Sequence, residues 1–138
     1  MADLPKLPDT EALALDLLNY YLPGEANFRT TAPNDWSKAL PLVWVARTSG
    51  RTVDYRVDHA ILSVSVVAST RKAASDLARR VQSAFYQARR DNYFSEEGVV
   101  SNFETIKGPQ LDRDGLTGKH PDSFNFDATY DLWARARD

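Results

Sequence analysis

The chain has 138 residues, of which 43% are hydrophobic and 26% are charged, and it contains no cysteine. This length and composition fit one globular domain and exclude a disordered, collagen-like or coiled-coil chain. The absence of cysteine excludes a disulfide framework, a thiolate zinc site and a cysteine nucleophile. Seventeen basic and nineteen acidic side chains leave a net charge of −2, which excludes the overall positive field of a dedicated nucleic-acid-binding domain.

Hydrophobic runs in the sequence are short. None approaches the roughly 18 residues that a membrane span requires, and residues 1–8 lack the apolar core of a signal peptide. We therefore expect a protein that is made in the cytoplasm and has no membrane partner.

The first predicted helix follows Asp9, the expected N-cap, and carries Glu11 in its first turn, where the helix dipole favours an acid. Pro23-Gly24 stops it after about three turns. Residues 25–40 mix strand and turn formers and are expected to form a loop, with a brief strand around Phe28. The helix presents a broad apolar stripe of Leu13, Ala14, Leu17, Leu18, Tyr20 and Tyr21.

Two apolar, β-rich segments come next, at residues 42–46 and 60–68. The intervening Ser49-Gly50 is a turn signal, so we expect the two segments to pair as antiparallel neighbours. Alternation in the second segment predicts one face toward the core, made by Leu62, Val64, Val66 and Ala68.

A long amphipathic helix is predicted after Thr70, its expected N-cap. Apolar residues recur at steps of three and four from Ala74 to Ala88. The opposite face is basic: between residues 71 and 90, six basic side chains and the single acid Asp76 give a local net charge of +5.

Two further strands are predicted at 99–107 and 124–137, the second with strict alternation of apolar and polar residues. Its inward set is Phe124, Phe126, Ala128, Tyr130, Leu132 and Ala134. Residues 108–123 between the strands are expected to form a long polar loop, and a connection of that length is usually functional or mobile.

This order of elements predicts a single α+β domain over residues 1–138, in which two helices pack on one face of a mostly antiparallel sheet of four to five strands. The second face of such a sheet lacks a cover unless another chain supplies it.

Catalytic motifs are absent. His59 and His120 have no metal-ligand spacing, residues 112–115 lack the later ligands of a calcium loop, and Gly118-Lys119 lacks the rest of a phosphate-binding loop. We therefore expect no enzyme activity, no metal and no cofactor.

The basic helix face has three interpretations. It is a solvated surface, or a subunit interface that meets the acidic N-terminal region of the next copy in a ring, or a nucleic-acid surface, for which Tyr86, Gln82 and Gln87 are the available base-contacting groups. Trp133 is predicted on the outward face of the last strand, where it packs on the loop or the first helix, or anchors a subunit contact.

Three segments stand out together: residues 40–47 (LPLVWVAR) with a following Gly50, residues 66–70 (VVAST) leading into an alanine-rich helix, and the closing aromatic strand at 130–135 (YDLWAR). In this order they resemble the tail terminator (tail-completion) proteins of long-tailed bacteriophages. The resemblance covers nearly the whole chain and rests on hydrophobicity and small-residue patterns.

The resemblance implies a structural virion protein at the head–tail junction. Such a protein forms a hexameric ring on the head-proximal end of the tail tube, ends tube polymerisation and joins the tail to the head connector. The implied partners are further copies of the chain, the tail tube protein and the connector (stopper) protein. DNA would pass through the ring without specific binding, and no cofactor is implied.

Two groups of residues are assigned to these contacts. The subunit interface is expected to contain Arg71, Arg79, Arg80, Arg89, Arg90 and Trp133, and the tube or connector contact Lys107, Arg113, Asp114 and Lys119. The alternative function is a small nucleic-acid-binding adaptor that uses the basic helix 71–90.

Overall fold

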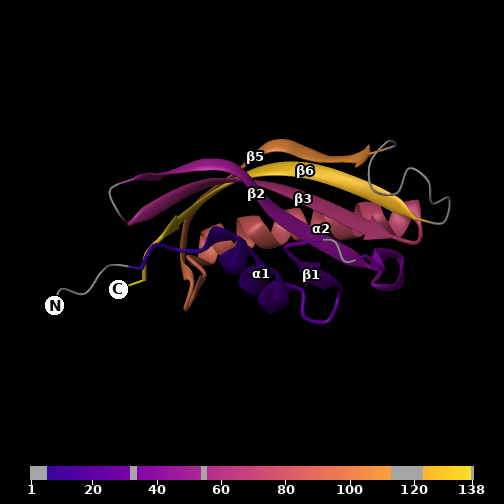
Figure 1. Cartoon of the computed structure of the whole chain (residues 1–138), viewed down its shortest axis with the longest axis horizontal. Helices are drawn as coiled ribbons and strands as arrows, with labels where there is room; N and C mark the ends of the chain where they lie inside the picture. The colour runs from indigo at the N-terminus through magenta and orange to yellow at the C-terminus, as the bar shows by residue number, and fades with distance from the viewer. Residues whose placement is uncertain (1–5, 32–33, 54–55, 113–122, 138) are drawn as a thin grey trace.

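The computed structural model describes residues 6–31, 34–53, 56–112 and 123–137. Two helices, α1 (Thr10–Tyr21) and α2 (Arg71–Asp91), lie on one face of a curled sheet (Figure 1). The strand order is β1-β2-β3-β6-β5-β4. The strands are β1 (Asn27–Arg29), β2 (Leu42–Val53), β3 (Val57–Ala68), β4 (Phe94–Ser95), β5 (Gly98–Asp112) and β6 (Phe124–Arg135), and a short 3-10 helix, η1, spans Trp36–Lys38.

The predicted α+β class is confirmed, but the prediction of four to five strands is wrong because the sheet has six. The extra strand is the short edge strand β4, whereas the other short edge strand, β1, is the brief strand predicted around Phe28. Since β1 runs parallel to β2 while the other pairs are antiparallel, the sheet is mixed. A two- or three-residue edge strand leaves too few residues for a periodic signal in the sequence.

Both helices begin at the predicted caps. The Asp9 side chain accepts a hydrogen bond from the Ala12 amide at 3.1 Å, and the Thr70 hydroxyl accepts one from the Ala73 amide at 3.1 Å. These bonds satisfy amide donors that have no partner inside the helix. At its other end α2 stops at Asn92, whose φ of 49° places it in the left-handed region.

The predicted turn at Ser49-Gly50 is wrong. Strand β2 runs through it to Val53, and Gly50 pairs with Ala60 of β3. A register shift between Arg47 and Ser49 absorbs the irregularity as a bulge. The glycine therefore serves a close approach of two strands rather than a chain reversal.

The predicted loop at 108–123 is also wrong in its first part, because β5 continues to Asp112. Gly108 and Pro109 lie inside the strand, where the pairing with β6 shifts register between Lys107 and Gln110. A shift of this kind tolerates proline, which has no amide to donate to the ladder. Residues 113–122 lie outside the described residues.

The core fills the space between the helices and the sheet. The inward sets predicted for the second and last long strands are confirmed, with Leu62, Tyr130 and Leu132 among the fully buried side chains. Rings from α2, β5 and β6 pack together at its centre: Phe85 stacks on Phe103 with centroids 4.9 Å apart, and the Phe103 and Tyr130 centroids lie 5.1 Å apart with the rings tilted by 50°. No helix of the described residues has the length and apolar character that a membrane span requires.

Candidate functional site: assembly surfaces

The basic face of α2 is only partly engaged within the chain. Arg79 pairs with Asp76 one turn earlier, and Arg80 pairs with Glu25, its Nη2 lying 2.8 Å from the carboxylate. A further contact runs from Arg89 to a backbone carbonyl of β5 at 3.4 Å. All six basic side chains of this face are exposed: Arg71, Lys72, Arg79, Arg80, Arg89 and Arg90.

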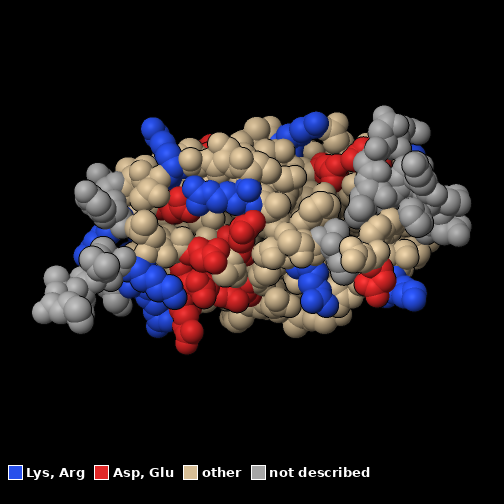
Figure 2. All heavy atoms as spheres, viewed as in Figure 1, with Lys and Arg blue, Asp and Glu red and all other residues tan. Residues whose placement is uncertain are grey.

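Acidic side chains gather over α1 and the β4–β5 turn, as Figure 2 shows. Glu11 accepts a hydrogen bond from the Arg47 amide at 2.8 Å, and Asp16 accepts one from the Ser95 hydroxyl at 2.7 Å. With Glu25 engaged by Arg80, part of the charge complementarity expected between subunits is satisfied within one chain.

Two of the three groups that a nucleic-acid surface would use on α2, Gln82 and Tyr86, bond to the sheet, and the third, Gln87, donates to Asp91 of the same helix. Gln82 donates to the Thr105 hydroxyl at 3.0 Å, and the Tyr86 hydroxyl lies 2.8 Å from the same oxygen. The Tyr86 ring also packs edge-on against Phe103, with centroids 4.8 Å apart. These contacts fix α2 on β5 and engage the Tyr86 hydroxyl and ring edge, although the side chain stays 39% exposed.

Trp133 lies on the sheet face opposite the helices, as predicted. Its ring stacks on His59 of β3, with centroids 4.2 Å apart and planes 19° from parallel, and residues 113–122 of the loop that was a predicted alternative lie outside the described residues. His59 in turn contacts the Asp131 carboxylate. Trp133 is therefore half-buried by its own strand neighbours, and its role at a subunit interface stays a prediction.

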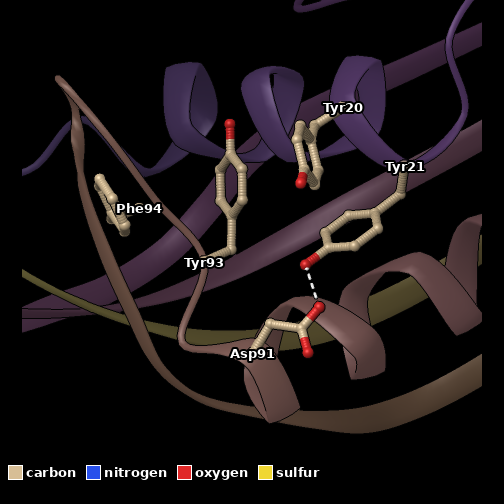
Figure 3. Close-up of a pocket in the computed structure, with 5 residues that line it drawn as sticks. All are labelled: Tyr20, Tyr21, Asp91, Tyr93 and Phe94. Carbon is tan, nitrogen blue, oxygen red and sulfur yellow. Dashed lines mark hydrogen bonds between the residues drawn. The ribbon is translucent and has the colours of Figure 1, made fainter.

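A hollow of about 340 Å³, here called the tyrosine hollow, lies between the ends of α1 and α2 and strand β4 (Figure 3). It is lined by Tyr20, Tyr21, Asp91, Tyr93 and Phe94. The three tyrosine rings contact one another, with centroids 4.9–5.9 Å apart. The Tyr21 hydroxyl donates to Asp91 at 2.7 Å.

The electrostatics of the tyrosine hollow follow from burial and nearby acids. Burial raises the pKa of Tyr21 well above its usual range, and its hydrogen bond to Asp91 adds to the effect. Burial also raises the pKa of Tyr93, with a further contribution from the charge of Asp16. Both phenols therefore remain neutral donors at physiological pH.

Sequence reasoning missed the tyrosine hollow. In the sequence, Tyr20 and Tyr21 belong to the apolar stripe of the first helix, and Asp91 belongs to the exit from the second. The hollow joins residues 70 positions apart, which no local pattern reveals. The available signal was that each of the two predicted helices ends at or near a pair of adjacent aromatic residues, Tyr20-Tyr21 in one case and Tyr93-Phe94 in the other.

The family model of the phage tail termination protein matches residues 6–137. The chain belongs to this family. A phage tail termination protein is a structural virion component, so the expectation of a non-enzymatic protein is confirmed. A comparison with curated protein sequences finds no match.

The fold has solved counterparts. A chain from the structure titled "Virion of native gene transfer agent (GTA) particle" superimposes with a TM-score of 0.53 at 13% sequence identity, covering 91% of this chain and 92% of that one. At this identity the likeness concerns the fold, and it extends over nearly the whole of both chains.

The remaining predicted contact residues of this tail termination protein are placed only in part. Lys107 lies exposed on β5, whereas Arg113, Asp114 and Lys119 fall outside the described residues. Among the residues that the structure does describe, no group of three or more histidine, aspartate or glutamate side chains is arranged to hold a metal ion.

The Asp127 carboxyl group of the tail termination protein is half-buried on the sheet face opposite the helices, where its charged form is unfavourable. Burial raises the pKa of Asp127 above its ordinary value, and the neighbouring Asp112 carboxyl raises it further. Hydrogen bonds from Ser65, at 2.7 Å, and from Asn125 act in the opposite direction without cancelling the rise.

We expect the Asp127→Asn variant to be more stable than the wild type at neutral pH. A carboxyl whose pKa is higher in the folded than in the unfolded state binds more protons when folded, so its contribution to stability falls as pH rises from about 4. Asparagine keeps an acceptor for Ser65 and removes the charge. Urea unfolding from pH 3 to 8 should show a stability gain that is near zero at pH 3 and grows with pH.

The matched control is Glu104→Gln, which removes an exposed carboxylate from β5 on the same sheet. Its stability should follow the wild-type profile more closely than that of Asp127→Asn. A gain for Asp127→Asn that is already full at pH 3 would contradict the charge-based explanation.

Proposed function

We propose that this tail termination protein forms a hexameric ring on the head-proximal end of the phage tail tube, where it ends tube polymerisation and joins the tail to the head connector. The observation that carries the proposal is the family match over residues 6–137. The fold shared with a chain of a gene transfer agent virion supports it, since that particle also contains a chain of this architecture.

The proposed partners are further copies of the chain, the tail tube protein and the connector (stopper) protein, at the head–tail junction of the virion. DNA passes through the ring without specific binding. The net charge of −2 supports this, because retention of DNA requires an excess of positive charge to neutralise phosphates.

Electron microscopy of tube protein polymerised with and without this protein tests the function. We expect shorter tubes that carry a density at one end, and free rings or end-bound rings of six copies. Tubes of unchanged length with bare ends would overturn the proposal. Binding of short DNA at low salt, in the absence of any effect on tubes, would favour the nucleic-acid-binding alternative instead.

The combined Arg79→Glu and Arg80→Glu variant should fold but assemble poorly. Both side chains are exposed, and exposed ion pairs contribute about 0–1 kcal/mol, so the loss of the Glu25 and Asp76 contacts costs little stability. Reversing two interface charges should weaken assembly by roughly tenfold or more. Sedimentation velocity gives the concentration at which rings form.

A matched double reversal away from α2 is Arg29→Glu with Lys38→Glu, on β1 and η1, where both side chains are exposed. It changes the net charge by the same amount. Equal assembly defects in the two variants would show that total charge, rather than the α2 face, governs ring formation.

A further inference from the structure

The tyrosine hollow leaves part of its aromatic surface exposed. Tyr20 is 66% exposed and Phe94 is 58% exposed, although both rings are large enough to gain substantially from burial. They stand beside Tyr93 at the mouth of the same hollow (Figure 3). Contiguous exposed aromatic groups of this kind mark a contact surface.

The chemistry of the tyrosine hollow suits a cationic side chain. Aromatic faces attract an ammonium or guanidinium group through the ring quadrupole. Asp91 adds a carboxylate that already accepts from Tyr21 and from Gln87, at 2.7 and 3.0 Å, and a carboxylate has about four acceptor positions. The same cluster already shows this chemistry, since the Arg137 guanidinium lies 4.8 Å above the Phe94 ring.

Helix α2 carries an unfavourable charge at each end. Arg71 and Lys72 lie in its first turn, where the helix dipole disfavours cations, and that turn has no acid. Both side chains are exposed and form no hydrogen bond or ion pair with the described residues. Asp91 ends the helix where the dipole disfavours a carboxylate, although Arg89 and Arg90 offset it there. A local conflict of this kind indicates a role outside the helix.

From these observations we infer that Arg71 and Lys72 of one copy of the chain bind the tyrosine hollow of the next copy. The inference rests on the proposed ring and names the contact that builds it. The two surfaces lie at opposite ends of a 21-residue helix, roughly 30 Å apart. In the proposed ring each copy uses the two surfaces on different neighbours, so the contact is heterologous, and a heterologous contact generates a ring when its rotation closes.

Cysteine cross-linking tests the contact directly, because the natural chain has no cysteine to interfere. One preparation carries Lys72→Cys and a second carries Tyr20→Cys. After mixing and mild oxidation we expect a covalent dimer that contains one chain of each kind, at a yield at least tenfold above that of either preparation alone. The matched control replaces Tyr20→Cys by Ile106→Cys, whose side chain is 56% exposed on β5. A yield no higher than this control overturns the inference.

A charge exchange gives a second, independent test. Asp91→Lys alone, and Arg71→Glu with Lys72→Glu, should each raise the ring-forming concentration at least tenfold while circular dichroism and thermal unfolding remain near wild type. The triple variant restores opposite charges across every contact and should recover most of the assembly. The pairing is overturned if Asp91→Lys and the Arg71→Glu, Lys72→Glu variant both fold and assemble normally. It is also overturned if the triple variant recovers no assembly.

The outcomes separate this contact from the proposed function. If the wild type shortens tubes while every variant behaves like it, the ring function stands and the contact is wrong. If the wild type neither forms rings nor shortens tubes, both are wrong. Protection of Tyr20→Cys from a thiol reagent by tube protein, with none in assembled rings, would assign the hollow to the tube and overturn the inference.

Discussion

Replacing Phe103 by alanine should lower the free energy of unfolding by about 3–5 kcal/mol, the cost of deleting a buried phenyl ring and leaving a cavity. Phe103 is fully buried on β5 and contacts Phe85 and Tyr86 of α2 as well as Tyr130 of β6. Its loss therefore loosens the attachment of α2 to the sheet. Urea unfolding followed by circular dichroism measures the change.

Ile106→Ala is the matched control on the same strand. Its side chain is 56% exposed, so its removal should change the free energy of unfolding by no more than about 0.5 kcal/mol. A loss below about 1.5 kcal/mol for Phe103→Ala would show that neighbouring rings refill the cavity. That result would contradict the rigid stacking of this centre.

The elements that the sequence predicted best are α2 and β6. Each contains a long periodic pattern, and α2 also begins at a defined cap, Thr70. In both, the apolar face predicted from periodicity is the buried one, because one face of each element meets the core along its whole length. The short edge strands carry no such signal and were missed in part.

The errors arose at glycines. Ser49-Gly50 and Gly108-Pro109 are strong turn signals, yet both lie inside long strands at register shifts. A bulge and a turn make the same demand on the chain, which is a residue that tolerates unusual backbone geometry. Only the pairing partner across the sheet distinguishes them, and a local turn signal does not identify that partner.

The candidate surfaces also divide into those that a local sequence pattern predicts and those that depend on tertiary packing. The basic face of α2 follows from one helical period and was predicted. The in-chain partner of Arg80 and the tyrosine hollow both depend on how α1 packs beside α2, so they required the structure. Part of the opposite charge that the sequence indicated is paired within the chain, because Arg80 of α2 binds Glu25 in the segment that follows α1.

Gly50→Ala should destabilise the protein by roughly 3–5 kcal/mol, through backbone strain and an added steric clash. Gly50 has a φ of +136°, a conformation that alanine rarely adopts. A Cβ at this position would lie 2.2 Å from the His59 carbonyl oxygen and 2.9 Å from the Ala60 Cα. Both obstacles are backbone atoms of β3, so no side-chain rotation relieves the clash and the β2–β3 pairing must open.

Gly108→Ala provides the comparison, since Gly108 also lies inside a long strand but, apart from its two chain neighbours, no heavy atom of the described residues lies within 4 Å of where an alanine Cβ would lie. Alanine there should be neutral or slightly stabilising, because glycine in a strand costs about 0.5–1 kcal/mol relative to alanine. Thermal unfolding of the two variants side by side distinguishes their roles. Equal tolerance at both positions would mean that Gly50 lies in a flexible turn, as its sequence context suggests, and that β2 ends before it.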